Sequence, residues 1–262
     1  MELQHMDTIP EISGSPTSGF IIGSVFISLL AWITYYKLVN FIISSRNVQW
    51  NFNIVATTHA LLLTSMSLVC MTYYNPPLLT KLCDSNQRPA AMVLSICLGY
   101  FIYDTSWCLI YWSEHKNVMN VVHHVITIAI ISVVLSVGVS AEASTNIIFA
   151  TEISTPFFMF RWFLREAQMK ESLLYHVNDF IFFGLYVTFR VFIGTWYVWN
   201  VISYPDCPPL VVELSLLAIS AVSWAWVPSL CKMFFYKIKK LMSSTDIQSG
   251  TSHVETKVPS LV

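Results

Sequence analysis

Seven long apolar runs constrain this chain more than any other feature of its sequence. A helix needs roughly 20 consecutive apolar residues to cross bilayer hydrocarbon. The runs are Gly19 to Ile43, Phe52 to Tyr74, Ala90 to Trp112, Val118 to Val139, Thr145 to Leu164, Val177 to Ile202 and Leu210 to Phe235. The fifth run carries Glu152, Pro156 and Arg161, so neighbouring helices must shield it, and six spans is the alternative count. The sequence therefore predicts an all-α, polytopic membrane protein with about seven transmembrane helices.

The composition of the chain agrees with a membrane protein. Hydrophobic residues make up 55% of it and charged residues only 11%, against roughly 25% charged in soluble domains. The net charge of -1 leaves no basic surface to neutralise phosphates, so we expect no nucleic-acid partner. We expect a disordered segment at 1–18, a first transmembrane helix at 19–43, one membrane domain at 48–240 and a disordered cytosolic tail at 241–262.

The distribution of Lys and Arg between the loops predicts the orientation. With seven spans, one side carries Lys81 and Arg88, and the other side carries eight Lys and Arg residues. Cytosolic loops are enriched in these residues, so the N-terminus is expected in the lumen and the C-terminus in the cytosol. Cys83 and Cys207 then fall on the oxidising side, where we expect them to form a disulfide. Small apolar packing is the expected role of the cysteines in or near the spans, which are Cys70, Cys97, Cys108 and Cys231.

A pair of adjacent histidines, His123 and His124, lies within the fourth apolar run. Lipid offers an imidazole no hydrogen bond, so polar groups in a spanning helix normally face a protein interior. His59, Asp104 and His124 each lie roughly 9 to 12 Å from the cytosolic end of their span, at a rise of about 1.5 Å per residue. Helical spacing places Tyr100 on the stripe of Asp104. We therefore expect His124 and Asp104 to converge on a sheltered pocket that opens toward the cytosol.

Two interpretations of these polar residues remain open. An imidazole beside a carboxylate is the usual arrangement of a general base, whereas interhelical hydrogen bonding explains His59 at least as well. His123 is turned by about 100° from His124 and can face elsewhere. The histidines lack the repeated clusters of membrane di-iron enzymes, so we expect no metal.

Two arginines in the later spans also require partners. Arg190 and Glu152 lie at comparable depth near mid-membrane, and a charged pair there costs far less than either ion alone, so we expect them to meet. Arg161 lies near the cytosolic boundary, where its guanidinium can snorkel or bind a phosphate or carboxylate head group.

Several separated motifs, in order along the chain, carry a resemblance to a known family. They are Gln49-Trp50-Asn51 with His59, Gly99-Tyr100 with Asp104, the His123-His124 pair, and Glu152 to Pro156 followed by Arg161-Trp162-Phe163. From about Val48 to Lys240 the chain resembles the TLC domain of translocating-chain-associating proteins, ceramide synthases and the neuronal ceroid lipofuscinosis ER protein. Within that family it resembles the small branch typified by TLC domain-containing protein 4. The resemblance implies a helical barrel of six spans after an extra first helix, in the endoplasmic reticulum, with a role in lipid metabolism or sensing.

One departure from the family limits what the resemblance implies. In ceramide synthases the His-His-x-x-Thr element, matched here by His123, His124 and Thr127, belongs to the acyl-CoA transfer site. Their following His-Asp-x-x-Asp element is replaced here by the segment from Thr151 to Thr155. Acylation of a sphingoid base is therefore not carried over.

Two functions of different classes are consistent with these residues. In the first, the protein binds or senses a membrane lipid without reacting with it. In the second, it is an acyltransferase that uses acyl-CoA as its co-substrate and no other cofactor, with His124 as the base, Asp104 orienting it and His123 alongside. The residues expected to hold the lipid or acyl-CoA are His59, Tyr100, Thr127, Glu152, Arg161 and Arg190.

Overall fold

The computed structural model describes residues 15–74, 84–112, 118–203 and 210–252, and their regular structure is helical apart from one isolated bridge between Ser85 and Val139. Within these ranges, seven helical segments are long and apolar enough to cross a membrane. The prediction of an all-α polytopic membrane protein is confirmed, and the fifth apolar run is among the seven. Cys83 and Cys207, for which a disulfide was predicted, lie outside the described residues.

The chain divides into two units, residues 1–221 and residues 222–262. The helices that lie wholly in the first unit are α1 (Ser18–Ile42), α2 (Val48–Val69), α3 (Arg88–Ile110), α5 (Val118–Val137), α6 (Ala141–Glu152), α7 (Thr155–Glu166), α8 (Leu173–Leu185) and α9 (Gly194–Ile202). Two π-helical turns, η1 (Cys70–Tyr74) and η2 (Tyr186–Ile193), follow α2 and α8. The last helix, α10 (Leu210–Ser252), begins in the first unit and carries Pro228 in the second. It continues into the segment 241–262, for which the sequence predicts disorder.

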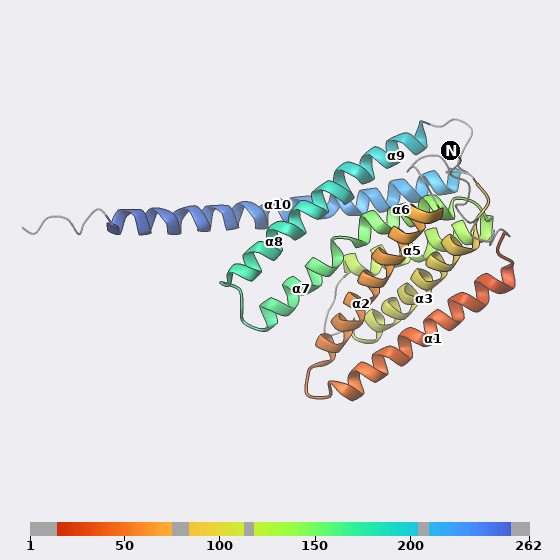
Figure 1. Ribbon diagram of the computed structural model, residues 1–262, viewed down its shortest axis with the longest axis horizontal. Helices are drawn as coiled ribbons and strands as arrows, with labels where there is room; N and C mark the ends of the chain where they lie inside the picture. The colour runs from red at the N-terminus through yellow and green to blue at the C-terminus, as the bar shows by residue number, and fades with distance from the viewer. Residues whose placement is uncertain (1–14, 75–83, 113–117, 204–209, 253–262) are drawn as a thin grey trace, which may run out of the picture. The chain divides into compact units, whose positions relative to one another are not determined.

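Local sequence explains where the first two helices begin. The Thr17 side chain accepts a hydrogen bond from the amide of Phe20, and the Asn47 side chain accepts one from the amide of Trp50. Such caps satisfy amides that have no partner within the helix. The two helices, with α3, lie side by side in Figure 1.

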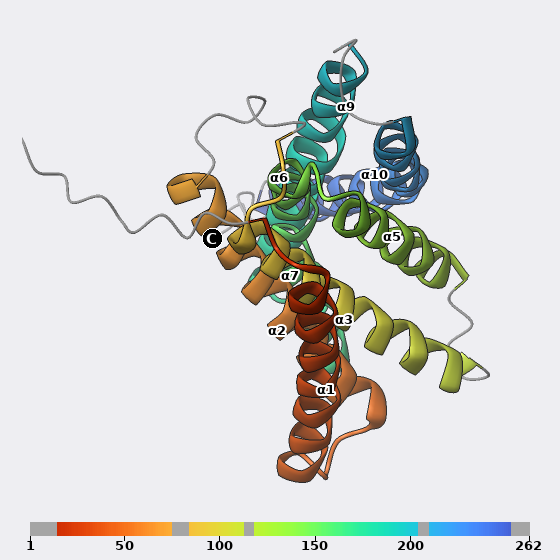
Figure 2. The ribbon, with the colours of Figure 1, turned by 90° about the vertical axis from the view of Figure 1, so that its right-hand side faces the viewer.

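Helix α3 is enclosed by its neighbours on several sides. It packs against α1, α2, α5 and α6, and the contact with α1 can be followed in Figure 2. Most side chains along α3 are buried, among them Tyr100, Asp104 and Trp107. This packing holds the polar groups of the third span inside the protein rather than in lipid.

The fifth span is broken in its middle. Helix α6 ends at Glu152, a turn follows at Ile153 and Ser154, and α7 begins at Thr155 with Pro156 in its first turn. Proline has no amide to donate, so the helical hydrogen-bond ladder cannot continue through it. The break leaves backbone carbonyls that need other partners within the protein.

Candidate functional site

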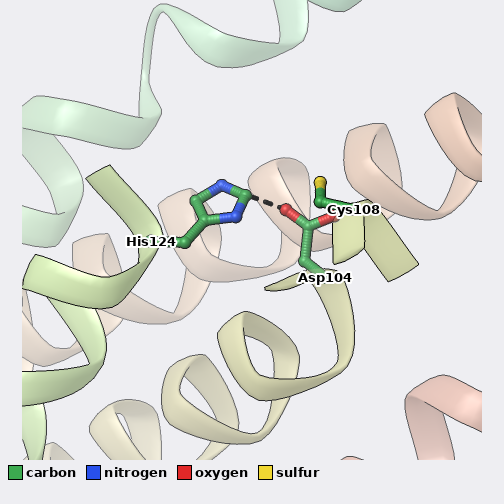
Figure 3. A group of neighbouring side chains, drawn as sticks. All are labelled: Asp104, Cys108 and His124. Carbon is green, nitrogen blue, oxygen red and sulfur yellow. Dashed lines mark ion pairs between the residues drawn. The ribbon is translucent and has the colours of Figure 1, made fainter. Parts of the chain in front are cut away.

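Asp104 and His124 meet where α3 packs against α5. His124 Nε2 lies 3.1 Å from Asp104 Oδ2, and each residue is only 4% exposed. Figure 3 shows the imidazole and the carboxylate facing one another from the two helices. The convergence expected from their depths is therefore present. A carboxylate in this position orients the imidazole and stabilises its protonated form.

A cavity of about 60 Å³ lies between α3, α5, α6 and the first part of α10. Its walls are mostly apolar, and the polar side chains among its lining residues are His123, Thr127, Ser144, Thr151 and Glu152. Two of these five residues, Thr127 and Glu152, were predicted to bind lipid, and His123 was predicted to lie beside the base. The cavity is therefore an apolar space with a small number of polar groups on α5 and α6.

The two adjacent histidines face different surroundings. His123 lines the cavity, whereas His124 contacts Asp104, as the turn of 100° between successive helical residues allows. Phe101 lies between the cavity and the Asp104–His124 pair. It lines the cavity, and its ring contacts both imidazoles edge-on, with centroid distances of 6.0 Å to His123 and 5.2 Å to His124. Neither His124 nor Asp104, which were expected to face a pocket, is among the residues that line this cavity.

His59 and Tyr100 form an aromatic cluster with Trp32 of α1. The rings of His59 and Tyr100 stack with centroids 3.5 Å apart, and Trp32 contacts both rings edge-on at 5.5 and 5.3 Å. His59 is 2% exposed, and neither of its ring nitrogens has a hydrogen-bond partner in the described part of the chain. Tyr100 lies one helical turn before Asp104, so this cluster adjoins the acid of the Asp104–His124 pair rather than the cavity.

Arg190, on η2, reaches the break between α6 and α7. Its Nη2 donates to the carbonyl oxygen of Thr151 and to the hydroxyl of Thr155, the latter at 3.0 Å. The expected ion pair between Arg190 and Glu152 is not found among the described residues. The positive charge still acts on the Glu152 carboxylate electrostatically. The break in the helix explains the difference, because it presents a carbonyl that needs a donor.

Arg161 is paired with a carboxylate on the next helix. Its Nε donates to Asp179 Oδ1 at 2.8 Å, and its guanidinium lies 5.5 Å from the ring centre of Tyr175. The side chains of Arg161 and Asp179 are 15% and 3% exposed. The pair joins α7 to α8, a contact that the sequence analysis did not predict.

Cys108 forms a group with Asp104 and His124 that the sequence analysis missed. One potential ligand atom of each residue lies within 4.8 Å of the other two (Figure 3). Cys108 follows Asp104 by four residues on α3 and therefore shares its face. The spacing of four residues between Asp104 and Cys108 was the available signal, but the sequence analysis assigned the Cys108 thiol only a role in apolar packing.

Comparison with known proteins identifies the family of this chain. The TLC domain model matches residues 49–239. TLC domain-containing protein 2 of Danio rerio is 25% identical over 234 residues, covering 84% of this chain and 90% of that protein. TLC domain-containing protein 4 A of Dictyostelium discoideum is 25% identical over 146 residues (55% of this chain, 56% of that protein), and TLC domain-containing protein 4 of Homo sapiens is 27% identical over 118 residues (45% and 44%). Since the family model covers everything from the start of α2 into α10, this chain belongs to the TLC domain family.

Proposed function

We propose that this protein acts in lipid homeostasis by binding part of a membrane lipid in the cavity between α3, α5, α6 and α10. The observation that carries the proposal is the lining of the cavity, which is apolar except for five polar side chains on α5 and α6. An acyl chain gains little by leaving the bilayer, because lipid tails are as apolar as leucine. Selectivity for a lipid must therefore come from shape and from the polar side chains.

His123 and Glu152 are the side chains best suited to recognise the polar part of a lipid. The hydroxyls of Thr127, Ser144 and Thr151 donate to backbone carbonyls of their own helices. The His123 imidazole and the Glu152 carboxyl are the strongest hydrogen-bonding groups among the ionisable side chains that line the cavity, which also include the Cys97 thiol. The imidazole can donate to an amide or ester carbonyl of a lipid, and the carboxylate can accept from an amide N–H or a hydroxyl group.

The size of the cavity limits what enters it. A volume of about 60 Å³ is about four to six times the roughly 10–15 Å³ that is enough to hold one water molecule on the same measure, which is far less than a whole lipid requires. The cavity is not fully enclosed, so a short segment of a lipid enters while the remainder stays in the bilayer. We therefore propose recognition near the junction of chain and head group.

A bulky substitution in the cavity tests this proposal. Ile130 lines the cavity on α5, and Val125 on the same helix is 53% exposed. Mass spectrometry of lipids that copurify with the chain in nanodiscs should show a lipid enriched over the surrounding membrane. Ile130→Trp is expected to remove this enrichment and Val125→Trp to retain it. Equal enrichment in all three proteins, or none in the unsubstituted chain, contradicts lipid binding in the cavity.

An acyltransferase is the second candidate function, favoured by the contact of 3.1 Å between His124 and Asp104. In this reaction His124 removes a proton from a lipid hydroxyl or amine, which attacks the thioester of acyl-CoA, and coenzyme A leaves as its thiol. Asp104 holds the imidazole and stabilises its charge. Incubation of purified protein with labelled acyl-CoA and membrane lipids tests this, and His124→Ala and Asp104→Asn are both expected to abolish labelled product.

We also propose that the protein resides in the endoplasmic reticulum with its C-terminus in the cytosol. The excess of Lys and Arg on the side of the C-terminal tail supports this orientation. In this orientation acyl-CoA is supplied from the same side as the predicted cytosolic loops.

A further inference from the structure

We infer that Asp104, Cys108 and His124 bind a divalent, borderline-soft metal ion of the zinc type. The three side chains supply a carboxylate oxygen, a thiol sulfur and an imidazole nitrogen, all within 4.8 Å of one another. Zinc takes this set of donors in proteins. The inference does not depend on lipid binding, because none of the three residues lines the cavity.

The spacing of the donor atoms fits a tetrahedral ion. A nitrogen and an oxygen each about 2.0 Å from zinc are roughly 3.3 Å apart, and His124 Nε2 lies 3.1 Å from Asp104 Oδ2. A sulfur bound to the same ion lies roughly 3.6 Å from each of the other two donors. The Cys108 sulfur is within 4.8 Å of both, so an approach of at most about 1.2 Å completes the three contacts.

The arrangement of the two helices supports a shared ion. Asp104 and Cys108 are four residues apart on α3, and Asn120 and His124 are four residues apart on α5. Residues at this spacing project from one helix face. The Asn120 side-chain amide donates toward Cys108 Sγ at 3.7 Å, and hydrogen bonds to a ligating sulfur stabilise its thiolate form.

The charge of such a site suits the interior of a membrane protein. A doubly charged cation with one carboxylate, one thiolate and one neutral imidazole has no net charge. An uncompensated ion at this depth is costly. No metal was expected because the histidines lack repeated clusters, whereas this donor set combines one histidine with a carboxylate and a thiol.

Cobalt provides a direct test, because a thiolate bound to Co²⁺ gives a charge-transfer absorption band in the near ultraviolet. The full-length chain is purified in detergent, its affinity tag is removed, bound metal is stripped with a chelator, and Co²⁺ is added. We expect one Co²⁺ per chain, the charge-transfer band, and loss of the band when Zn²⁺ is added. Absence of the band in the unsubstituted chain overturns the inference.

Two cysteine variants locate the ion. Cys108→Ser should remove the charge-transfer band, and Cys70→Ser, which changes a buried thiol on η1, should retain it. A band that survives in Cys108→Ser overturns the assignment. If Cys108→Ser does not fold, protection of Cys108 from alkylation by Zn²⁺ in the unsubstituted chain gives the same answer, and equal alkylation with and without Zn²⁺ contradicts it.

The same preparations distinguish this inference from the lipid-binding proposal. Cys108→Ser leaves the cavity lining unchanged, so the copurifying lipid should persist when the cobalt band is lost. An ion on His124 would occupy the nitrogen that faces Asp104. Metal binding and general-base catalysis are therefore alternatives at this nitrogen, and the metal content of the active protein decides between them.

Discussion

Three polar side chains in the interior of this protein are held by specific partners on other helices. Arg161 pairs with Asp179, Arg190 bonds to the backbone and hydroxyl of two threonines, and His124 contacts Asp104. Each contact joins different helices of the chain. In lipid such groups have no water as an alternative partner, so loss of one partner leaves the other uncompensated.

Removal of one partner of the Arg161–Asp179 pair should destabilise the fold. Asp179 is 3% exposed, and breaking a buried ion pair from one side costs about 3 kcal/mol or more. We expect Arg161→Ala to lower the free energy of unfolding by on the order of 3 kcal/mol, measured by chemical unfolding in detergent. Arg165→Ala, at an exposed position on the same helix, serves as the control. Equal, small losses in both variants would show that the pair contributes little.

For single residues, the sequence predicts the depth and helix face of a polar side chain better than it predicts the group that this side chain bonds. Depth and helical phase correctly placed His124 opposite Asp104, because both lie on unbroken helices. The same argument failed for Glu152 and Arg190, because it treated the fifth span as one straight helix. The turn at Ile153 and Ser154 leaves the Thr151 carbonyl free to accept a hydrogen bond from Arg190. The position of side chains around a helix does not reveal that a backbone carbonyl needs a donor.

At the level of the helices, α1 is an integral part of the packing although it precedes the residues matched by the TLC domain model. Ser28 of α1 donates to the carbonyl oxygen of Ile96 at 2.9 Å, and Tyr36 accepts a hydrogen bond from Trp107 Nε1 at 3.2 Å. Trp32 covers the His59 and Tyr100 rings. The sequence predicted α1 as a span but contained no signal for its neighbour, because its hydrophobic residues surround the helix on all sides.

Gly99 is the position at which a substitution should separate α1 from α3. A Cβ at Gly99 would lie 2.5 Å from Ser28 Oγ and 2.8 Å from the backbone nitrogen of Leu29, so α1 must shift. We expect Gly99→Ala to lower the free energy of unfolding by about 1–3 kcal/mol, as overpacking does. Gly184→Ala, where a Cβ meets nothing within 4 Å, is the matched control in α8. A difference between the two variants in thermal unfolding midpoint measures the effect, and equal midpoints would contradict close packing of α1.

At the scale of the whole molecule, the number of spans determines where the two ends lie. Seven segments are long and apolar enough to cross a membrane, including the broken one from Ala141 to Glu166. The sequence predicted this number because span length and hydropathy are local properties. It could not predict the cavity, because that space depends on how the side chains of four helices pack together.

An odd number of spans places the N-terminus and the C-terminus on opposite sides of the membrane. The excess of Lys and Arg on the C-terminal side predicts which end is cytosolic. In permeabilised cells with an intact endoplasmic reticulum membrane, a protease should therefore remove a C-terminal tag and leave an N-terminal tag protected. Removal of both tags would mean that one of the seven segments does not span the membrane. The broken fifth segment would be the first candidate, because it contains Glu152 and Arg161. Removal of the N-terminal tag alone would be consistent with seven spans but would reverse the orientation. Cys83 and Cys207 would then face the reducing cytosol, where a disulfide does not persist.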